Sequence, residues 1–304
     1  MEPTEILDAH IHLYAPEAAS DPRGWGLAHR EGGWVECVAP AGRRSIQGWS
    51  DPGALIADMV AAGVSACVML GWYWQSQDTC ELQNGWYRDW VRMHPDRLIG
   101  FAAVQPAAGR RSVEALERAL DSGLCGVGEL LPQAQGYSLE DPWLRRVVEV
   151  AAGRRAPLTF HATDPGAGPA AGPKTPLDAY VRLARDYPEA TLILAHWGGG
   201  LAFSGLAGGE PLPGNLYFDT AASPLLYDFG VFRKAVHRVG AGRILYGSDY
   251  PLLVYPRTSK KPDFRPFLAE IGAAGLSPAE RGQILGANLR RLLPEGLAPG
   301  RKRV

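Results

Sequence analysis

The chain has 304 residues, of which 46% are hydrophobic and 21% are charged, the balance of a folded globular protein with a large core. A formal net charge of −1 gives no field that attracts nucleic acid or an anionic membrane, and no apolar run approaches the roughly 18 residues that span a bilayer. The N-terminus Met1–Glu5 is acidic, whereas a signal peptide begins with basic residues. We therefore expect a cytoplasmic protein that acts on a small molecule without a nucleic-acid or membrane partner, and a homo-oligomer is compatible with this composition.

Short apolar runs, rich in Val, Ile, Leu and Phe, alternate along the chain with helix-like segments, as is typical of parallel strands buried on both faces. We predict strands at Thr4–His12, Val64–Leu70, Leu98–Val104, Cys125–Leu131, Pro157–His161, Thr191–His196, Asn215–Thr220 and Arg243–Asp249, and helices at Pro52–Ala62, Glu81–Met93, Ser112–Ser122, Asp141–Gly153, Leu177–Tyr187, Phe229–Val239 and Ser277–Leu293. Eight such alternations predict an α/β fold, a single (β/α)8 TIM barrel over residues 1–304. A doubly wound open sheet is the rival fold, but no glycine-rich phosphate-binding motif follows any of these strands.

Three connections are longer than plain links between a strand and a helix. The segment Tyr14–Asp51 is rich in Trp, Gly and Pro, which predicts an ordered insertion over the site. Asp164–Pro176 and Gly198–Gly214 follow the fifth and sixth strands and are candidates for mobile lids. All three leave the carboxyl ends of strands, where barrel active sites are built.

The first strand ends with two strong metal ligands, His10 and His12. Successive side chains of a strand alternate between its faces, so these two point the same way, about 6.5–7 Å apart along the strand. Two imidazoles that lean inward can bind one ion at Zn–N distances of about 2.0–2.1 Å. Two ordinary histidines fit the same spacing, so the other strands decide between these interpretations.

Ionisable residues also lie at the ends of later strands: Glu129 on the fourth, His161 on the fifth, His196 on the sixth and Asp249 on the eighth. Such side chains at the mouths of buried strands cost desolvation energy unless they are paired or bind a metal. Because the carboxyl ends of barrel strands meet, we expect all of these residues to converge with the histidine pair. This convergence favours a metal site over isolated core histidines.

In this order and spacing the chain resembles the amidohydrolase superfamily, and more narrowly the amidohydrolase-related family of metal-dependent TIM-barrel hydrolases and decarboxylases. The matching motifs are DAHIH at 8–12, GVGEL at 126–130, FHAT at 160–163, LAHWGG at 194–199, GSDYP at 247–251 and ILGANLRRLL at 284–293. The resemblance therefore spans nearly the whole chain.

The resemblance implies that His10, His12 and His161 bind a divalent metal, usually zinc. It also implies that Asp249 orients or deprotonates a metal-bound water, and that His196 holds the substrate oxygen or a second metal. Physical chemistry agrees with these roles, because a cation held by three neutral imidazoles lowers the pKa of bound water from 15.7 to about 7. A carboxylate beside that water can pass its proton to a leaving group.

Glu129 bears on whether the site holds one ion or two. Superfamily members with two metals place a bridging carboxylate on the fourth strand, so this residue favours a binuclear hydrolase. The alternative is that Glu129 orients His161 without touching metal, since ligating histidines commonly need such a partner.

Large side chains after the second, sixth and eighth strands predict the substrate pocket. Trp72, Trp74 and Trp197 would form aromatic walls, and Arg257 would bind a substrate carboxylate through its fork of donors. The other interpretation of Arg257 is a solvated loop residue.

These observations predict a metal-dependent hydrolase of a small amide, lactone or ester, with a metal-activated water and Asp249 as the proton shuttle. A non-hydrolytic decarboxylase of an aromatic or unsaturated acid is the alternative, since the family contains both reaction types. A metal-free barrel that serves only as a binding module is a third possibility, and the complete ligand set argues against it.

Overall fold

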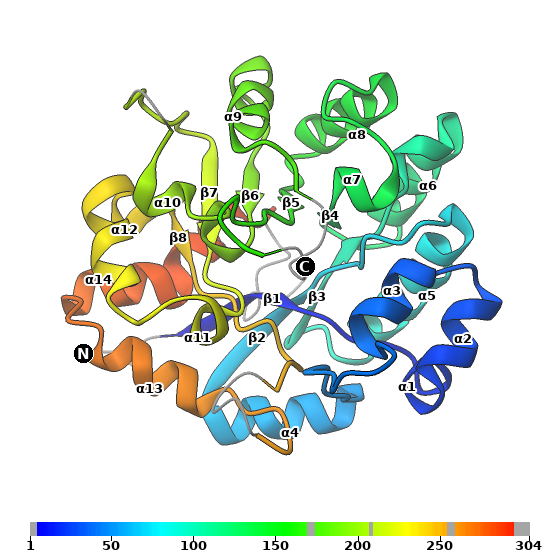
Figure 1. Ribbon diagram of the computed structural model, residues 1–304, viewed down its shortest axis with the longest axis horizontal. Coiled ribbons are helices and arrows are strands. Elements are labelled where there is room, and N and C mark those ends of the chain that lie inside the picture. Colours follow the sequence, from blue (N-terminus) through cyan, green and yellow to red (C-terminus); the bar gives the residue numbers. More distant parts are fainter. Residues whose placement is uncertain (1–4, 169–173, 207–208, 254–258, 295–304) are drawn as a thin grey trace.

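The computed structural model describes residues 5–168, 174–206, 209–253 and 259–294, and Figure 1 shows strands around one centre with helices outside them. Each strand pairs in parallel with the next along the chain, in the order β1 to β8. The strands are β1 (Ile6–Ile11), β2 (Val64–Met69), β3 (Leu98–Ala102), β4 (Gly126–Leu130), β5 (Leu158–Phe160), β6 (Leu192–Leu194), β7 (Leu216–Asp219) and β8 (Ile244–Leu245). Each lies inside its predicted range, and the predicted (β/α)8 barrel is confirmed.

The first and last strands are joined by backbone hydrogen bonds beyond the end of β8. Asp249 N donates to His10 O (2.9 Å) and His12 N donates to Tyr250 O (2.8 Å). Tyr250 also forms an isolated parallel bridge with Ile11. We call this set of contacts the seam, and it holds the segment after β8 against the carboxyl end of β1.

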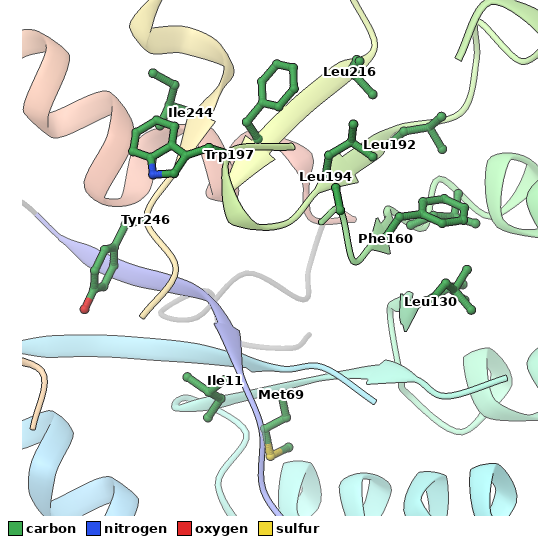
Figure 2. Close-up of a cluster of buried hydrophobic side chains, with 14 of the residues drawn as sticks. Ile11, Met69, Leu130, Phe160, Leu192, Leu194, Trp197, Leu216, Ile244 and Tyr246 are labelled. Carbon is green, nitrogen blue, oxygen red and sulfur yellow. The ribbon is translucent and has the colours of Figure 1, made fainter. Parts of the chain in front are cut away.

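The strand residues that face the surrounding helices are apolar because those helices cover the outer face of the sheet. Leu158 and Phe160 of β5 are fully buried, and Figure 2 shows Phe160 in one cluster with Leu130, Leu192 and Leu194 of the neighbouring strands. Burial of such side chains stabilises a fold by about 1.5–3 kcal/mol each. This packing fixes the strands whose ends carry the site.

Some of the helices around the sheet begin at a side-chain cap, as the helix at Pro52–Ala62 does. Before the helix at Pro52–Ala62, the Asp51 carboxylate accepts a hydrogen bond from Ala54 N, and after it Gly63 adopts φ 72°, which favours glycine. These helices are α4 (Pro52–Ala62), α5 (Gln77–Met93), α6 (Arg110–Asp121), α7 (Pro132–Gln135), α8 (Pro142–Gly153), α9 (Leu177–Asp186), α10 (Leu201–Ser204), α11 (Ser223–Leu226), α12 (Val231–Val239) and α13 (Arg265–Ala273), with 3₁₀ turns at Pro106–Ala108, His196–Gly198 and Ala241–Arg243. The sequence prediction omits the short helices α7, α10 and α11 and also α13.

The predicted C-terminal helix is divided. α14 (Pro278–Gly282) and α15 (Asn288–Leu292) flank a π-helical turn at Gln283–Ala287. The turn passes close to the residue before β1, because a Cβ on Gly286 would come within 2.4 Å of Glu5 O. None of the helices in the described part of the chain is long and apolar enough to cross a membrane.

The predicted insertion Tyr14–Asp51 is ordered. It contains α1 (Pro16–Ser20), α2 (Pro22–Ala28) and α3 (Gly32–Val38). Trp34 of α3 packs against Trp74 after β2, and the buried Glu31 carboxylate accepts hydrogen bonds from Gln75 N (2.8 Å) and Ser76 N (3.0 Å). The insertion is thus fastened to the loop that follows β2.

The two predicted lids are only partly described. Residues 169–173 and 207–208 lie outside the described residues, and the part of the second segment that is described contains α10.

Candidate metal centre

The ionisable residues predicted at the strand ends come together at the carboxyl end of the barrel. His10 lies in β1 and Glu129 in β4. His12 and His161 directly follow β1 and β5, and His196 and Asp249 lie in the segments after β6 and β8. Their ligand atoms form overlapping groups within 4.8 Å of one another, namely His10, His12 and Glu129; His10, His196 and Asp249; and Glu129, His161 and His196. Each group could hold a divalent ion. We call these side chains the metal cluster.

The histidine pair of β1 presents two lone pairs to one point. Nδ1 of His12 lies 3.1 Å from Leu70 O, and Nδ1 of His10 lies 2.8 Å from Asp219 Oδ2. Both partners accept hydrogen bonds, so we assign the ring proton to Nδ1, which leaves the lone pair of each neutral ring on Nε2. The two Nε2 atoms are 3.1 Å apart. Facing lone pairs at this distance repel each other unless a cation binds both, so the arrangement fits a divalent metal.

Asp219, at the end of β7, accepts hydrogen bonds from two residues of the metal cluster, His10 and His196. Its Oδ2 accepts from His10 Nδ1, and its Oδ1 accepts from His196 N at 3.0 Å and from Ala221 N at 3.0 Å. It is fully buried. Our sequence reasoning missed this residue, although it stands one residue before the end of the predicted strand Asn215–Thr220.

The field inside the metal cluster attracts positive charge. Burial disfavours the charged form of His10, yet the carboxylates of Asp219, Glu129 and Asp249 outweigh it and raise the pKa of His10 to about 10. Burial also favours a neutral Glu129, but His161 and His10 hold the pKa of that carboxyl well below its usual range. A site that draws a proton onto a buried imidazole is one that a divalent cation can occupy instead.

Glu129 lies between the two pairs of histidines. Its Oε2 is 3.5 Å from His12 Nε2 and 3.9 Å from His10 Nε2. Its Oε1 is 3.0 Å from His161 Nδ1 and 3.7 Å from His196 Nε2. One carboxylate therefore reaches all four imidazoles, which is compatible both with a bridging ligand and with a partner that orients His161.

His196 and Asp249 are aimed into the metal cluster by unusual backbone conformations. Their φ angles are 56° and 62°, in the left-handed region that few residues other than glycine adopt. Asp249 Oδ1 lies 3.7 Å from His10 Nε2 and 3.8 Å from His12 Nε2. Such conformations concentrate at functional sites, where the surrounding structure holds them.

A cavity of about 180 Å³ opens onto the metal cluster. Trp72 and Tyr73 form its aromatic wall, with their rings stacked at 4.2 Å, and Tyr73 meets the ring of His161 edge-on at 5.6 Å. The insertion contributes Cys37 and Ile46. Trp72 therefore lies where the sequence predicts, and the ordered insertion does lie over the site.

The other residues predicted to contact substrate are placed differently. Trp74 is fully buried beside the insertion, and its Nε1 donates to Gln83 Oε1 at 2.6 Å. Trp197 is fully buried in the core, and its Nε1 donates to Ser223 Oγ at 2.9 Å. Neither ring lines the described cavity, because each follows its strand in a turn that directs it inward. Arg257 lies outside the described residues.

A family model described as amidohydrolase matches residues 7–294. The chain therefore belongs to the amidohydrolase family. A comparison with curated protein sequences finds no significant match.

Solved structures with the same fold include two decarboxylases and a hydratase. 5-Carboxyvanillate decarboxylase from Sphingomonas paucimobilis is 18% identical with a TM-score of 0.70, over 95% of this chain and 99% of that one. A dihydroxybenzoic acid decarboxylase from a Polaromonas species, solved with manganese and 2-nitroresorcinol, is 17% identical with a TM-score of 0.66, over 95% and 97%. 4-Oxalomesaconate hydratase from Rhodopseudomonas palustris is 21% identical with a TM-score of 0.67, over 95% of each chain.

These comparisons correct the predicted reaction. The prediction of a hydrolase is wrong, because the similar structures are mostly decarboxylases, which agree better with the stated alternative. Manganese, rather than zinc, is the ion bound in two of them.

Proposed function

We propose that this member of the amidohydrolase family is a metal-dependent decarboxylase of an aromatic or unsaturated carboxylic acid. The observation that carries the proposal is that four imidazoles and two carboxylates form overlapping groups beside a cavity with an aromatic wall. The likeness to solved decarboxylases supports the choice of reaction.

The residues that would hold the ion are His10, His12, Glu129, His161 and His196, and Asp249 would lie beside the ion as the proton donor. A divalent ion there supplies positive charge that binds the substrate's oxygens and stabilises the negative charge that develops as CO₂ leaves. Nitrogen and carboxylate ligands suit manganese as well as zinc.

The side chains around the ion have separate tasks. Trp72 and Tyr73 offer a flat wall on which a planar acid can stack, and they exclude water from it. The bond between the carboxylate and its carbon breaks, and its electron pair stays on that carbon. Asp249 donates a proton to the same carbon, so that a C–H bond replaces the C–C bond. Its carboxylate then regains a proton from water, and the net reaction consumes one proton for each CO₂ released.

The experiment loads the protein with manganese or zinc and measures CO₂ release from a panel of aromatic and unsaturated acids in deuterated water. We expect metal-dependent release of CO₂ and one deuterium at the carbon that carried the carboxylate. Asp249→Asn should abolish most of both signals, whereas Asp228→Asn, an exposed carboxylate on another loop, should leave them unchanged. Acid release from esters or lactones with no CO₂ from any acid would overturn the proposal.

A further inference from the structure

A second cavity, of about 200 Å³, adjoins the metal cluster and is not used by the chemistry described above. It shares His161, His196, Asp249 and Leu252 with the first cavity. Its remaining walls come from the loops that follow β5 and β7, with Ala162, Thr163, Asp164, Ala167, Ala222, Leu225, Leu226 and Tyr227. A molecule bound at the metal cluster can therefore extend into a space whose walls are largely apolar.

The charged group in this cavity outside the metal cluster is the half-buried Asp164 carboxylate. Its Oδ1 accepts a hydrogen bond from Gly166 N at 2.7 Å, and its Oδ2 accepts one from Tyr227 OH at 3.2 Å. These two bonds fix the orientation of the carboxylate. An ionised carboxylate has about four acceptor positions, so Asp164 keeps capacity for a further donor.

The Tyr227 side chain is the hydroxyl partner of the Asp164 carboxylate. Its ring meets Phe203 edge-on at 5.2 Å. Burial, and then the negative charge of Asp164, raise the pKa of the Tyr227 phenol above its usual value of 10. The hydroxyl therefore stays protonated near neutral pH and donates to Asp164.

The negative charge of Asp164 favours some ligand groups in this cavity over others. Among the described residues that line it there is no lysine or arginine. An anionic group that reached Asp164 would be repelled, and an apolar group would bury the carboxylate without a new partner, which costs free energy. A group that donates a hydrogen bond would satisfy it.

We infer that the second cavity binds the end of the substrate remote from the carboxylate that is lost, and that Asp164 selects a hydroxyl or amino group there. The inference rests on the proposed function for the assignment of the reacting end. A hydrogen bond to a charged acceptor corresponds to about a 10- to 100-fold gain in affinity over a group of the same size that cannot donate.

The test uses benzoates that carry a hydroxymethyl, aminomethyl, ethyl or carboxymethyl group in the para position. The first three groups match closely in size, and the carboxymethyl group is larger and anionic, so its binding is compared between the wild type and the Asp164 variant. Their dissociation constants are measured by calorimetry with the manganese-loaded full chain. We expect the wild type to bind the hydroxymethyl or aminomethyl compound about tenfold or more tightly than the ethyl compound, and to bind the carboxymethyl compound least tightly. The comparison of hydroxymethyl with aminomethyl separates a neutral donor from a cation.

Asp164→Asn should reduce the preference for donors to a few-fold and restore binding of the carboxymethyl compound. Tyr227→Phe should retain the preference, because it leaves the carboxylate in place. The matched control is Asp228→Asn, since Asp228 Oδ1 accepts from Gly230 N at 2.9 Å in the same kind of turn but does not line the cavity. It should bind like the wild type.

Equal binding of all four compounds by the wild type, or an unchanged preference in Asp164→Asn, would overturn the inference even if the protein decarboxylates other acids. Discrimination that depends on Asp164 without CO₂ release from any acid would leave the inference standing and refute the proposed reaction. Failure of all four compounds to bind would overturn the inference directly.

Discussion

Replacing Glu129 with glutamine tests whether this carboxylate binds metal directly. The residue is 2% exposed, and its oxygens lie 3.0–3.9 Å from the ring nitrogens of four histidines. Two unit charges 4 Å apart attract by about 4 kcal/mol at an effective dielectric of 20, so a dication beside this carboxylate gains about 8 kcal/mol before desolvation is subtracted. Even a third of that amount corresponds to about a 100-fold change in affinity.

We therefore expect Glu129→Gln to raise the dissociation constant for manganese more than about 100-fold, beyond the 10- to 100-fold usual for residues that only orient a ligand. Titration of the metal-free protein with manganese, followed by calorimetry, measures both affinity and stoichiometry. A fall from two equivalents to one would identify Glu129 as a bridge between two ions. Glu31→Gln is the matched control, because Glu31 is also buried but its carboxylate accepts hydrogen bonds from Gln75 N and Ser76 N in the loop after β2.

A small effect of Glu129→Gln would show that this carboxylate does not bind metal. If Glu129→Gln keeps the wild-type stoichiometry and loses no more than about 10- to 100-fold in affinity, the carboxylate only orients His161 through their 3.0 Å contact. The reasoning from the four short distances would then be refuted.

Four further predictions concern single substitutions, three of them at or beside the metal cluster and one at the insertion. His12→Ala should remove most of the bound metal and the activity with it, as elemental analysis beside the CO₂ assay will show, and a fully active metal-free variant would contradict the site. Asp249→Asn should lower kcat about 10²- to 10⁴-fold while retaining metal, and near-normal turnover would place the proton donor elsewhere. Asp219→Asn, which weakens the partner of His10, should reduce metal affinity about 10- to 100-fold in titrations, and unchanged affinity would deny it that role. Burial raises the pKa of Glu31 from its usual value of 4.5, so the folded state binds the Glu31 proton more tightly than the unfolded state does. The wild type should therefore lose stability relative to Glu31→Gln as the pH rises from 4.5. Urea titrations of both proteins measure this difference in the free energy of unfolding, and an increase with pH would refute the prediction.

Periodicity predicted the barrel well because strands covered on both faces are largely apolar, as β6 (Leu192–Leu194) is. It was less accurate at helix ends, which depend on single caps. α5 begins at Gln77, earlier than predicted, because the Ser76 side chain accepts a hydrogen bond from Asp78 N. The start of α5 could not be predicted from hydrophobic periodicity, because that bond involves polar groups only.

The metal cluster could be predicted because the carboxyl ends of the strands in a parallel barrel meet at one face, and the loop conformations do not change this. The same rule, applied to every strand, would also have found Asp219. The pocket could not be predicted in this way, because the direction of a loop side chain depends on its own partners. Trp72 faces the cavity, whereas Trp74 turns toward Gln83 and Trp197 toward Ser223.

The seam between β1 and the segment after β8 also has a consequence for the order of folding. Its hydrogen bonds involve His10, His12 and Asp249 themselves, so the contacts that close the barrel and those that assemble the metal cluster form together. These residues stand near opposite ends of the sequence, and such non-local contacts form late and slowly. A chain emerging from the ribosome therefore has no complete binding site until its last strand is made. Once bound, the ion links the two ends of the chain, and the amide hydrogens of His12 and Asp249 should exchange with solvent more slowly in the loaded protein than in the metal-free one.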